Sequence, residues 1–283
     1  MQNKEFSWFL GWLFTDGSIV NPSYRFKGDE SHISFCLQYS DNEVLHKIKN
    51  ILQTKAKVRL YPNYKSPQCQ INIYDRKDII FQYYNIKNEY PSDVLDRHYI
   101  RGAFDGDGTL YYRENRNSFS IKLYNTNIEM LEKISKILSN KLFIDYKAPK
   151  CYRTDSPVYL LEWEGKIARY IAWYLYHGDI ENCVLERKYN YYKKYILFNQ
   201  QPESKAEELF IALGYQGQYF INRKNNGIVI HMNCKSKDSL IWSKRLQNII
   251  KNSTPIPISK GQTKYYALYI PTTNMQDIEI NIS

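Results

Sequence analysis

FLGWLFTDG at residues 9–17 and IRGAFDGDG at residues 100–108 decide the fold of this chain. Each stretch is an apolar helical run with a glycine at its third position, and each ends in Asp-Gly. A glycine lets a second helix approach backbone to backbone, and the closing Asp-Gly ends the helix with a carboxylate at its tip. Two such helices packed together bring Asp16 and Asp107 side by side. Paired carboxylates are what a divalent cation needs to activate water against a phosphodiester bond.

The sequence after each Asp-Gly also repeats. A helix-capping pattern of the form S/T-x-x-E occurs at residues 40–43 and again at 126–129, and each opens an amphipathic helix. The segment Val94–Tyr99 has a counterpart at Val184–Tyr189. Corresponding landmarks, including the two Asp-Gly steps, lie between 86 and 91 residues apart. This regularity indicates a duplicated unit with small differences in loop length.

Alternation of apolar and polar residues between these landmarks predicts strands. Each unit is expected to run helix, two strands, helix, two strands, helix, which places four antiparallel strands against helices on one face. The other face of each sheet stays free for solvent or a ligand. The predicted fold class is therefore α+β, with two pseudo-symmetric αββαββα repeats. The expected strands lie at 24–27, 32–39, 57–61, 68–74, 110–113, 118–124, 143–147 and 158–163, and the closing helices at 77–87 and 167–176.

Charge and composition favour a polyanionic partner. Lysine and arginine number 39 against 29 aspartates and glutamates, which gives a net charge of +10. Each phosphate contact by Lys or Arg releases bound counterions, so this surplus suits nucleic acid, although a solvated basic surface would have the same charge. The 27 tyrosines, many beside basic residues, fit a groove that follows a nucleic-acid backbone and fit a half-buried sheet equally well.

The cysteines and the N-terminus bear on the compartment. Five scattered cysteines without a Cys-x-x-Cys pair argue against a zinc site and a disulfide framework, and favour a reducing environment. The N-terminus has no secretory character, and no apolar run reaches membrane-spanning length. We expect a soluble intracellular protein without a membrane partner.

Three domains are expected along the chain. The first repeat takes residues 1–92, the second takes residues 93–198, and a linker precedes a smaller α/β segment at 203–283. This segment is either a degenerate third repeat without its Asp-Gly helix or an added DNA-binding module. Its expected helices lie at 205–213 and 238–251, and its strands at 219–222, 228–232 and 264–270.

The two motifs and the repeat resemble the LAGLIDADG homing endonucleases in their single-chain form. The first motif keeps Gly11, Asp16 and Gly17, and the second keeps the four residues Gly102, Asp105, Asp107 and Gly108. The resemblance covers about residues 6–195. It implies a site-specific DNA endonuclease of mobile introns that acts as a monomer, because both half-sites lie on one chain.

The resemblance also implies the geometry of the site. The two motif helices would pack at a pseudo-dyad, and the two sheets would form a saddle over the DNA major groove. Asp16 and Asp107 would hold Mg²⁺ or another divalent cation such as Mn²⁺. The backbone carbonyls of Thr15 and Gly106 would complete the ligand shell. Asp105 is interpreted as structural, because Phe14 occupies its position in the first motif.

A basic residue near each metal is a further implication of the resemblance. Candidates for this catalytic role are Arg97, Arg187 and Lys188, which lie in the repeated Leu-acid-Arg segments. Lys87 is a rival candidate for the first repeat. A surface charge that flanks a helix explains each of them equally well.

Polar and basic side chains on the expected strands are candidate DNA contacts, since Arg pairs with guanine and Gln or Asn with adenine. These candidates are Arg25, Lys27, Gln38, Arg59, Gln70, Asn72, Arg113, Lys122, Tyr124, Lys147 and Arg153. A nucleic-acid-binding protein without cleavage, such as an intron RNA maturase or a regulator on the same scaffold, is the alternative function. Retention of both aspartates favours cleavage.

Overall fold

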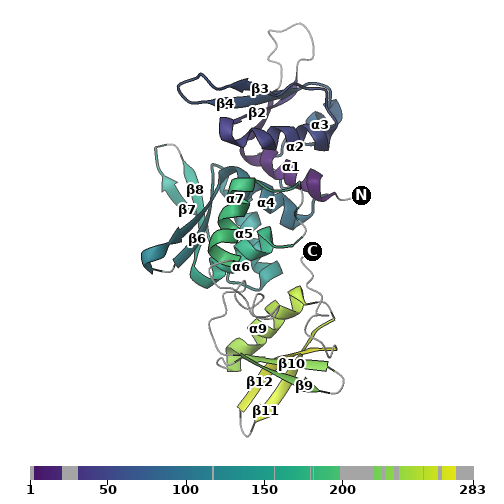
Figure 1. Cartoon of the computed structure of the whole chain (residues 1–283), viewed down its shortest axis with the longest axis vertical. Helices are drawn as coiled ribbons and strands as arrows, with labels where there is room; N and C mark the ends of the chain where they lie inside the picture. The colour runs from purple at the N-terminus through teal and green to yellow at the C-terminus, as the bar shows by residue number, and fades with distance from the viewer. Residues whose placement is uncertain are drawn as a thin grey trace.

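The computed structural model describes residues 3–20, 31–116, 118–155, 157–178, 180, 182–197, 219–224, 227–232, 236–250, 252–260 and 263–271. These residues form three units that follow one another along the longest axis of the molecule (Figure 1). We call them the first repeat (residues 3–92), the second repeat (93–197) and the third unit (219–271). Each unit contains one four-stranded antiparallel sheet with the same strand order.

The first repeat opens with the helix that carries the first Asp-Gly. Its elements are α1 (Lys4–Thr15), β1 (Gly17–Val20), β2 (His32–Gln38), the 3-10 turn η1 (Tyr39–Asp41), α2 (Asn42–Leu52), β3 (Arg59–Tyr61), β4 (Gln68–Ile73) and α3 (Lys77–Gln82). The strands are arranged in the order β1-β2-β4-β3, so the two hairpins pair through β2 and β4.

The second repeat has the same element order and opens with the helix of the second motif. Its elements are α4 (Asp96–Asp107), β5 (Gly108–Arg113), η2 (Glu114–Arg116), β6 (Ser118–Asn125), α5 (Ile128–Leu142), β7 (Lys150–Arg153), β8 (Val158–Glu164), α6 (Gly165–Tyr176), α7 (Glu186–Tyr192) and the π-helical turn η3 (Lys193–Leu197). The strands are arranged in the order β5-β6-β8-β7.

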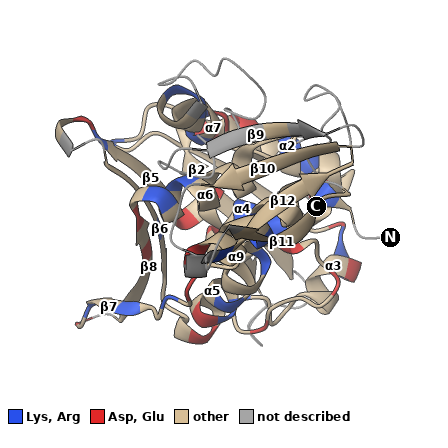
Figure 2. Cartoon of the chain, turned by 90° about the horizontal axis from the view of Figure 1, so that it is seen from below, with Lys and Arg blue, Asp and Glu red and all other residues tan. Residues whose placement is uncertain are grey.

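The third unit repeats the strand and helix order without a motif helix among its described residues. Its elements are β9 (Tyr219–Lys224), β10 (Gly227–Met232), α9 (Ser236–Ile249), β11 (Thr254–Lys260) and β12 (Thr263–Ile270). Its strands run β9-β10-β12-β11. Seen along the long axis, this sheet lies across the end of the molecule and does not continue the sheet of the second repeat (Figure 2).

One face of each of the first two sheets is apolar and packs on helices. Along β2, Ile33, Phe35 and Leu37 are buried, and along β6, Phe119, Ile121 and Leu123 are buried. The residues between them point to the opposite, outer face, because successive side chains alternate in a strand. The fold class predicted from the sequence, α+β with αββαββα repeats, is confirmed.

The two motif helices, α1 and α4, pack through their glycines. A methyl group added to Gly11 would overlap the carbonyl oxygen of Tyr99, and one added to Gly102 would overlap the carbonyl oxygen of Trp8. Only glycine permits this backbone-to-backbone contact. The crossing brings the C-terminal ends of the two helices together at the interface between the repeats.

The predicted capping boxes are wrong in detail. The helix α2 begins at Asn42 with Asp41 at its N-cap, and Ser40 makes no cap hydrogen bond. The helix α5 begins at Ile128, and its cap is Asn127, whose side chain accepts a hydrogen bond from the Met130 amide. Both helices therefore start one residue later than the S/T-x-x-E pattern predicts.

The strand predicted at 143–147 is also wrong. Phe143 ends α5 in the left-handed conformation, with φ of 50°. The following residues then bond back to the helix, since Ser139 Oγ donates to the Ile144 carbonyl and Ser135 Oγ donates to the Lys147 carbonyl. The strand that pairs with β8 begins only at Lys150. In the first repeat, β3 is likewise shorter than predicted, and the helix expected to reach residue 87 ends at Gln82.

The third unit differs from its prediction by one strand. The strand β11 was not expected, because Pro255 and Pro257 interrupt its sequence, but it lies at the edge of the sheet, where proline is tolerated. The expected strand 24–27 and the expected helix 205–213 lie outside the described residues. Within the part of the chain that the structure describes, no helix is long and apolar enough to cross a membrane.

Candidate functional site

The carboxylates of the two motifs lie where α1 and α4 end. Asp16 is the C-cap residue of α1, and Asp107 is the last residue of α4. Gly106 lies directly against the other motif, because a side chain at this position would overlap Thr15 Oγ1 and the Asp16 carboxylate. The structure thus brings together the four residues predicted from the motifs as metal ligands.

The electrostatics of this point suit a cation. Burial at the helix ends, together with repulsion from Asp107, raises the pKa of Asp16 to about 6, against the attraction of Lys188 and Lys87. Burial also raises the pKa of Asp107, opposed first by Lys87 and then by Lys188. Two carboxylates forced together in this way favour protonation unless positive charge arrives between them.

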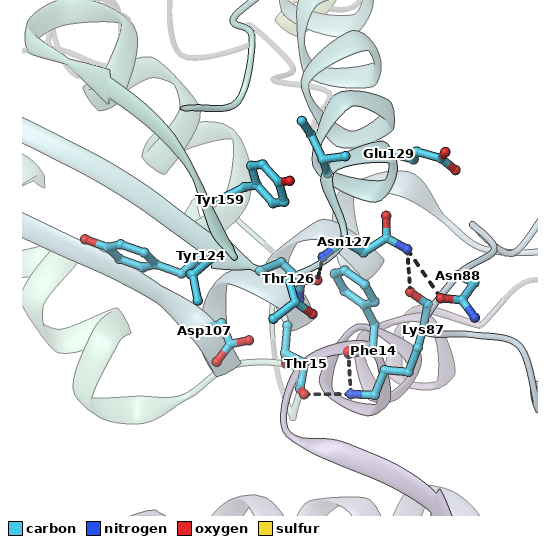
Figure 3. A pocket seen from close by; sticks show the side chains of 13 residues that line it. Phe14, Thr15, Lys87, Asn88, Asp107, Tyr124, Thr126, Asn127, Glu129 and Tyr159 are labelled. Atoms are coloured by element: carbon cyan, nitrogen blue, oxygen red, sulfur yellow. Dashed lines mark hydrogen bonds between the residues drawn. The ribbon is translucent and has the colours of Figure 1, made fainter. Parts of the chain in front are cut away.

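A lysine closes the C-terminal end of each motif helix. Lys87 Nζ donates to the carbonyls of Phe14 and Thr15, at 2.6 and 2.7 Å (Figure 3). Lys188 Nζ donates to the carbonyls of Phe104, Asp105, Gly106 and Gly108, at 2.6, 2.6, 3.2 and 2.7 Å. The Phe104 carbonyl also accepts from the Gly108 amide, whereas the last carbonyls of a helix have no partner in the next turn. The two ammonium groups therefore act as C-terminal caps of α1 and α4.

Both lysines carry a depressed pKa. Burial lowers the pKa of Lys87 to about 8 and that of Lys188 to about 8, although the nearby carboxylates oppose the shift. Lys188 is 6% exposed. Each ammonium is therefore held in a poorly hydrated position close to the two carboxylates.

A cavity of about 840 Å³ opens beside Asp107 on the side of Lys87 (Figure 3). Its wall comes from both repeats: Thr15, Lys87 and Asn88 belong to the first, and Asp107 and Asn127 belong to the second. The cavity therefore gives access to the place where the C-terminal ends of α1 and α4 meet, at Thr15, Asp16, Gly106 and Asp107, which we call the joint between the motif helices.

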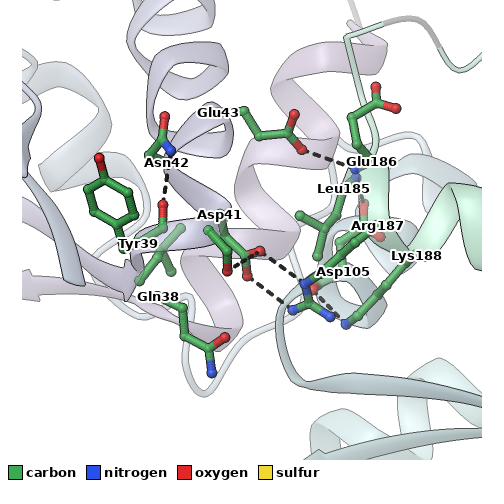
Figure 4. A network of polar contacts seen from close by, with 12 residues as sticks. Gln38, Tyr39, Asp41, Asn42, Glu43, Asp105, Leu185, Glu186, Arg187 and Lys188 are labelled. Atoms are coloured by element: carbon green, nitrogen blue, oxygen red, sulfur yellow. Dashed lines mark hydrogen bonds and ion pairs between the residues drawn. The ribbon is translucent and has the colours of Figure 1, made fainter. Parts of the chain in front are cut away.

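The structure corrects two of the predicted basic residues. Arg97 lies in the first turn of α4, at the opposite end of the helix from Asp107, and its guanidinium donates to the carbonyls of Tyr174 and His177. Arg187 pairs with Asp41 through two contacts of 3.0 Å (Figure 4). The rival candidate Lys87, not Arg97, occupies the position in the first repeat that Lys188 occupies in the second.

Asp105 is fully buried where four helices meet. It accepts hydrogen bonds from Trp8 Nε1 on α1, from the Tyr176 hydroxyl on α6 and from the Leu185 amide before α7, at 2.8, 2.8 and 3.0 Å. Burial raises its pKa, against the opposing charge of Lys188. The structural interpretation of Asp105 agrees with these contacts. The sequence also suggested, from Phe14 in the first motif, that the charge of Asp105 is dispensable, but three donors depend on its carboxylate.

Most of the predicted DNA contacts lie on the outer faces of the first two sheets. These faces can be followed from the pairing, because directly paired residues point to the same side of a sheet. The residues so placed are Gln38, Arg59, Gln70 and Asn72 on the first sheet, and Arg113, Lys122 and Tyr124 on the second.

The remaining predicted contacts differ in their placement. Arg153 is exposed and pairs with Val158 beyond a bulge in the β7–β8 ladder. Val158 lies on the same side of β8 as Leu160, the partner of Tyr124, so Arg153 also lies on the outer face. Lys147 is not on the sheet, because its backbone is bonded to the side chain of Ser135 in the middle of α5. Arg25 and Lys27 lie outside the described residues.

The donor groups at the joint fit a hard divalent cation. Within the described residues, no group of three or more His, Cys, Asp and Glu side chains is gathered as a complete metal cage. A cation at Asp16 and Asp107 would instead take oxygens from two carboxylates, from the carbonyls of Thr15 and Gly106, and from substrate and water. Mg²⁺ is typically held in this way.

A family model and several solved structures are similar to this chain. Residues 95–171 match the family model described as a LAGLIDADG-like domain. No curated protein matches the chain. Among solved structures, the meganuclease I-SmaMI bound to uncleavable DNA has 11% identity and a TM-score of 0.45, and covers 74% of this chain and 97% of its own.

Two other solved structures are similar at the same level. The homing endonuclease I-GzeII in complex with its DNA target has 9% identity and a TM-score of 0.43, and covers 77% of this chain and 98% of its own. I-DmoI in complex with DNA and Mn has 15% identity and a TM-score of 0.42, and covers 56% and 88%. The chain thus contains a LAGLIDADG-like domain at residues 95–171, and the resemblance predicted from its two motifs is confirmed.

Proposed function

We propose that this protein is a site-specific, divalent-metal-dependent DNA endonuclease that makes a double-strand break in a long recognition site. The observation that carries the proposal is the joint between the motif helices, where two carboxylates meet between the buried Lys188 and the half-buried Lys87. A protein that only binds nucleic acid has no need for paired carboxylates with raised pKa values, since they repel a phosphate.

Each group at the joint has a proposed role. Asp16 and Asp107 would hold Mg²⁺ or Mn²⁺ with the carbonyls of Thr15 and Gly106. Such a cation would supply a Lewis acid for the phosphate and a water of lowered pKa. The ammonium of Lys188, and that of Lys87 on the other side, stabilises the charge that grows on the cleaved phosphate. Because both lysines already cap the motif helices, they are fixed before substrate arrives.

The outer faces of the first two sheets are the proposed DNA-binding surface. Ser34, Gln70 and Asn72 lie together on the first, where Ser34 Oγ donates to Asn72 Oδ1 at 3.0 Å. On the second, Lys122 forms an ion pair with Glu162 at 2.7 Å. Such mutual hydrogen bonds hold base-reading side chains in place, and their partners can be exchanged for base edges in the major groove.

The third unit is proposed as a degenerate third repeat. It packs against the second repeat, stabilises it and supplies no catalytic residue. It repeats the strand order of the other sheets. Its helix α9 docks on the second repeat, where Arg245 donates to the Phe143 carbonyl and Asn248 donates to the Lys141 carbonyl. Its other sheet face carries Val229, Ala267 and Tyr269, beside an Asn222–His231 hydrogen bond of 3.2 Å.

The test is cleavage of a plasmid library that carries a randomised insert. The purified chain, acting as a monomer, should linearise a small set of plasmids in Mg²⁺ or Mn²⁺ and none in EDTA, and sequencing of the cut ends should return one long site. Binding to that site should weaken steeply with salt, with on the order of five to ten counterions released. Retention of nucleic acid with no cut in any metal would instead support the non-cleaving alternative, an RNA maturase or a regulator.

A further inference from the structure

Asp41 forms a two-point ion pair between the first repeat and the end of the second. It is the N-cap residue of α2, yet its carboxylate makes no cap hydrogen bond. Both of its oxygens instead accept from the Arg187 guanidinium at 3.0 Å, and Asp41 is only 5% exposed (Figure 4). A two-point pair of this kind fixes direction as well as distance.

Other residues of α2 hold the same turn. Glu43 Oε1 accepts from the Glu186 amide at 3.1 Å, and Lys47 Nζ donates to the Val184 carbonyl at 2.8 Å. All three contacts end on residues 184–187, immediately before Lys188. The N-terminal end of α2 therefore holds the turn that presents this lysine to the motif helix of the second repeat.

The same arrangement recurs on the other side of the joint with different chemistry. Asn127 is the N-cap of α5, and its side-chain oxygen caps the helix by accepting from the Met130 amide. Its side-chain nitrogen donates to the Lys87 carbonyl at 3.0 Å and lies 3.5 Å from Asn88 Oδ1 (Figure 3). The start of the middle helix of the second repeat thus holds the lysine of the first.

We infer that Asp41 and Asn127 are positioning residues that cross the repeat interface, each fixing the catalytic lysine carried by the opposite repeat. The inference rests on the proposed endonuclease function for its catalytic consequence only. It couples the two half-sites, because the angle between the repeats then sets the place of both ammonium groups. The Asp41 contact is charge-assisted and doubled, so it carries the larger effect.

The first arm of the test needs no DNA. Asp41→Asn and Arg187→Gln each remove the ion pair, and hydrogen exchange of a peptide spanning residues 184–192 should become about fivefold faster or more in both. Glu132→Gln, which breaks an exposed ion pair with Lys136 on α5, is the matched control and should leave this peptide unchanged. Unchanged exchange in both pair variants, with intact melting curves, would overturn the inference whether or not the protein cuts DNA.

The second arm measures each strand separately on an end-labelled copy of the site recovered by the wild type. Asp41→Asn should slow, by about tenfold or more, the same strand that Lys188→Met slows. Asn127→Ser, which keeps a capping oxygen but is too short to reach Lys87, should slow the other strand, the one that Lys87→Met slows. Nicked product should accumulate in each case, at near-wild-type affinity.

A general electrostatic effect predicts a different pattern. Asp41→Asn removes a negative charge near Asp16, whereas Arg187→Gln removes a positive one, so their effects on a carboxylate would have opposite signs. Positioning predicts that both slow one strand, and that the double variant is no slower than either single variant. Equal slowing of both strands, or additive effects, would contradict it. If the wild type cuts nothing, the proposed function fails while the exchange arm still decides the inference.

Discussion

The motif helices α1 and α4 cross at the same glycine contact but differ in what surrounds it. The helix α1 is apolar along its buried length, and Phe14 stacks on Tyr99 with ring centroids 6.2 Å apart. In α4 the equivalent position is Asp105, bonded to three helices, and Arg101 is fully buried beside it. The comparison indicates that glycine fixes the crossing, while the second motif also fastens the closing helices of its repeat.

The largest loss of stability is expected at Asp105, the polar member of this comparison. Asp105→Leu leaves the Trp8 nitrogen, the Tyr176 hydroxyl and the Leu185 amide without an acceptor, and it removes a negative charge beside Lys188. We expect a loss of about 3–5 kcal/mol in unfolding free energy. Phe14→Leu, its counterpart in the first motif, should cost about 1 kcal/mol. Urea denaturation measures both losses of unfolding free energy. Equal losses would show that the hydrogen bonds to Asp105 add nothing to the stability.

The shared half of the comparison is tested at the glycines. Gly11→Ala and Gly102→Ala force a methyl group into a carbonyl oxygen of the other helix, so each should cost about 2–4 kcal/mol. Gly165→Ala is the control, because its added methyl meets no neighbour and only the positive φ of 63° is strained, at about 1 kcal/mol. Full stability of either motif variant would contradict the close crossing.

A smaller effect is expected where the third unit docks. Arg245 lies over the rings of Trp242 and Tyr170, at 4.6 and 5.8 Å, and bonds to the end of α5. Arg245→Ala should lower stability by about 1 kcal/mol and leave the length of DNA protected by the protein unchanged. A footprint shortened at one flank would instead indicate that this unit binds DNA.

The smallest effect is a pH dependence at Asp16. Its pKa is raised in the folded protein, so the folded state keeps this proton where the unfolded chain has lost it. Without metal, stability should therefore fall as pH rises from about 4 to about 6, by a few degrees at most because Asp16 as a residue is exposed and its carboxylate is only partly shielded. Thermal melts of the wild type and Asp16→Asn measure it, and the variant should lack this component.

The sequence predicted the motif helices, both repeats and most of the outer faces, because glycine spacing and strand alternation are local patterns. It named the lysine of the first repeat, Lys87, only as a rival to Arg97. The echo between Val94–Tyr99 and Val184–Tyr189 marks the starts of α4 and α7 and aligns Lys188 with His98. The spatial counterpart, Lys87, comes earlier in the chain, and only the carbonyls that it contacts distinguish it from Arg97.

The positioning role of Asp41 and Asn127 was missed for a related reason. Both residues lie inside the capping patterns, which predict a helix start. A polar residue there is explained by capping alone, so the pattern gives no sign of a second role. Their contacts reach 146 and 40 residues along the chain, to Arg187 and Lys87. Lys147 was wrongly placed on a strand, because the side chain of Ser135 on α5 forms hydrogen bonds with the backbone of Lys147.

The central claim is that Asp16 and Asp107 jointly hold the metal that cleaves DNA. The most direct test measures binding and cleavage of the recovered site by Asp16→Asn and by Asp107→Asn in Mg²⁺. Each change removes a metal-binding charge but no contact from the outer sheet faces, so affinity should stay within about tenfold of the wild type while double-strand cleavage is lost. Full double-strand cleavage by either variant would contradict the claim.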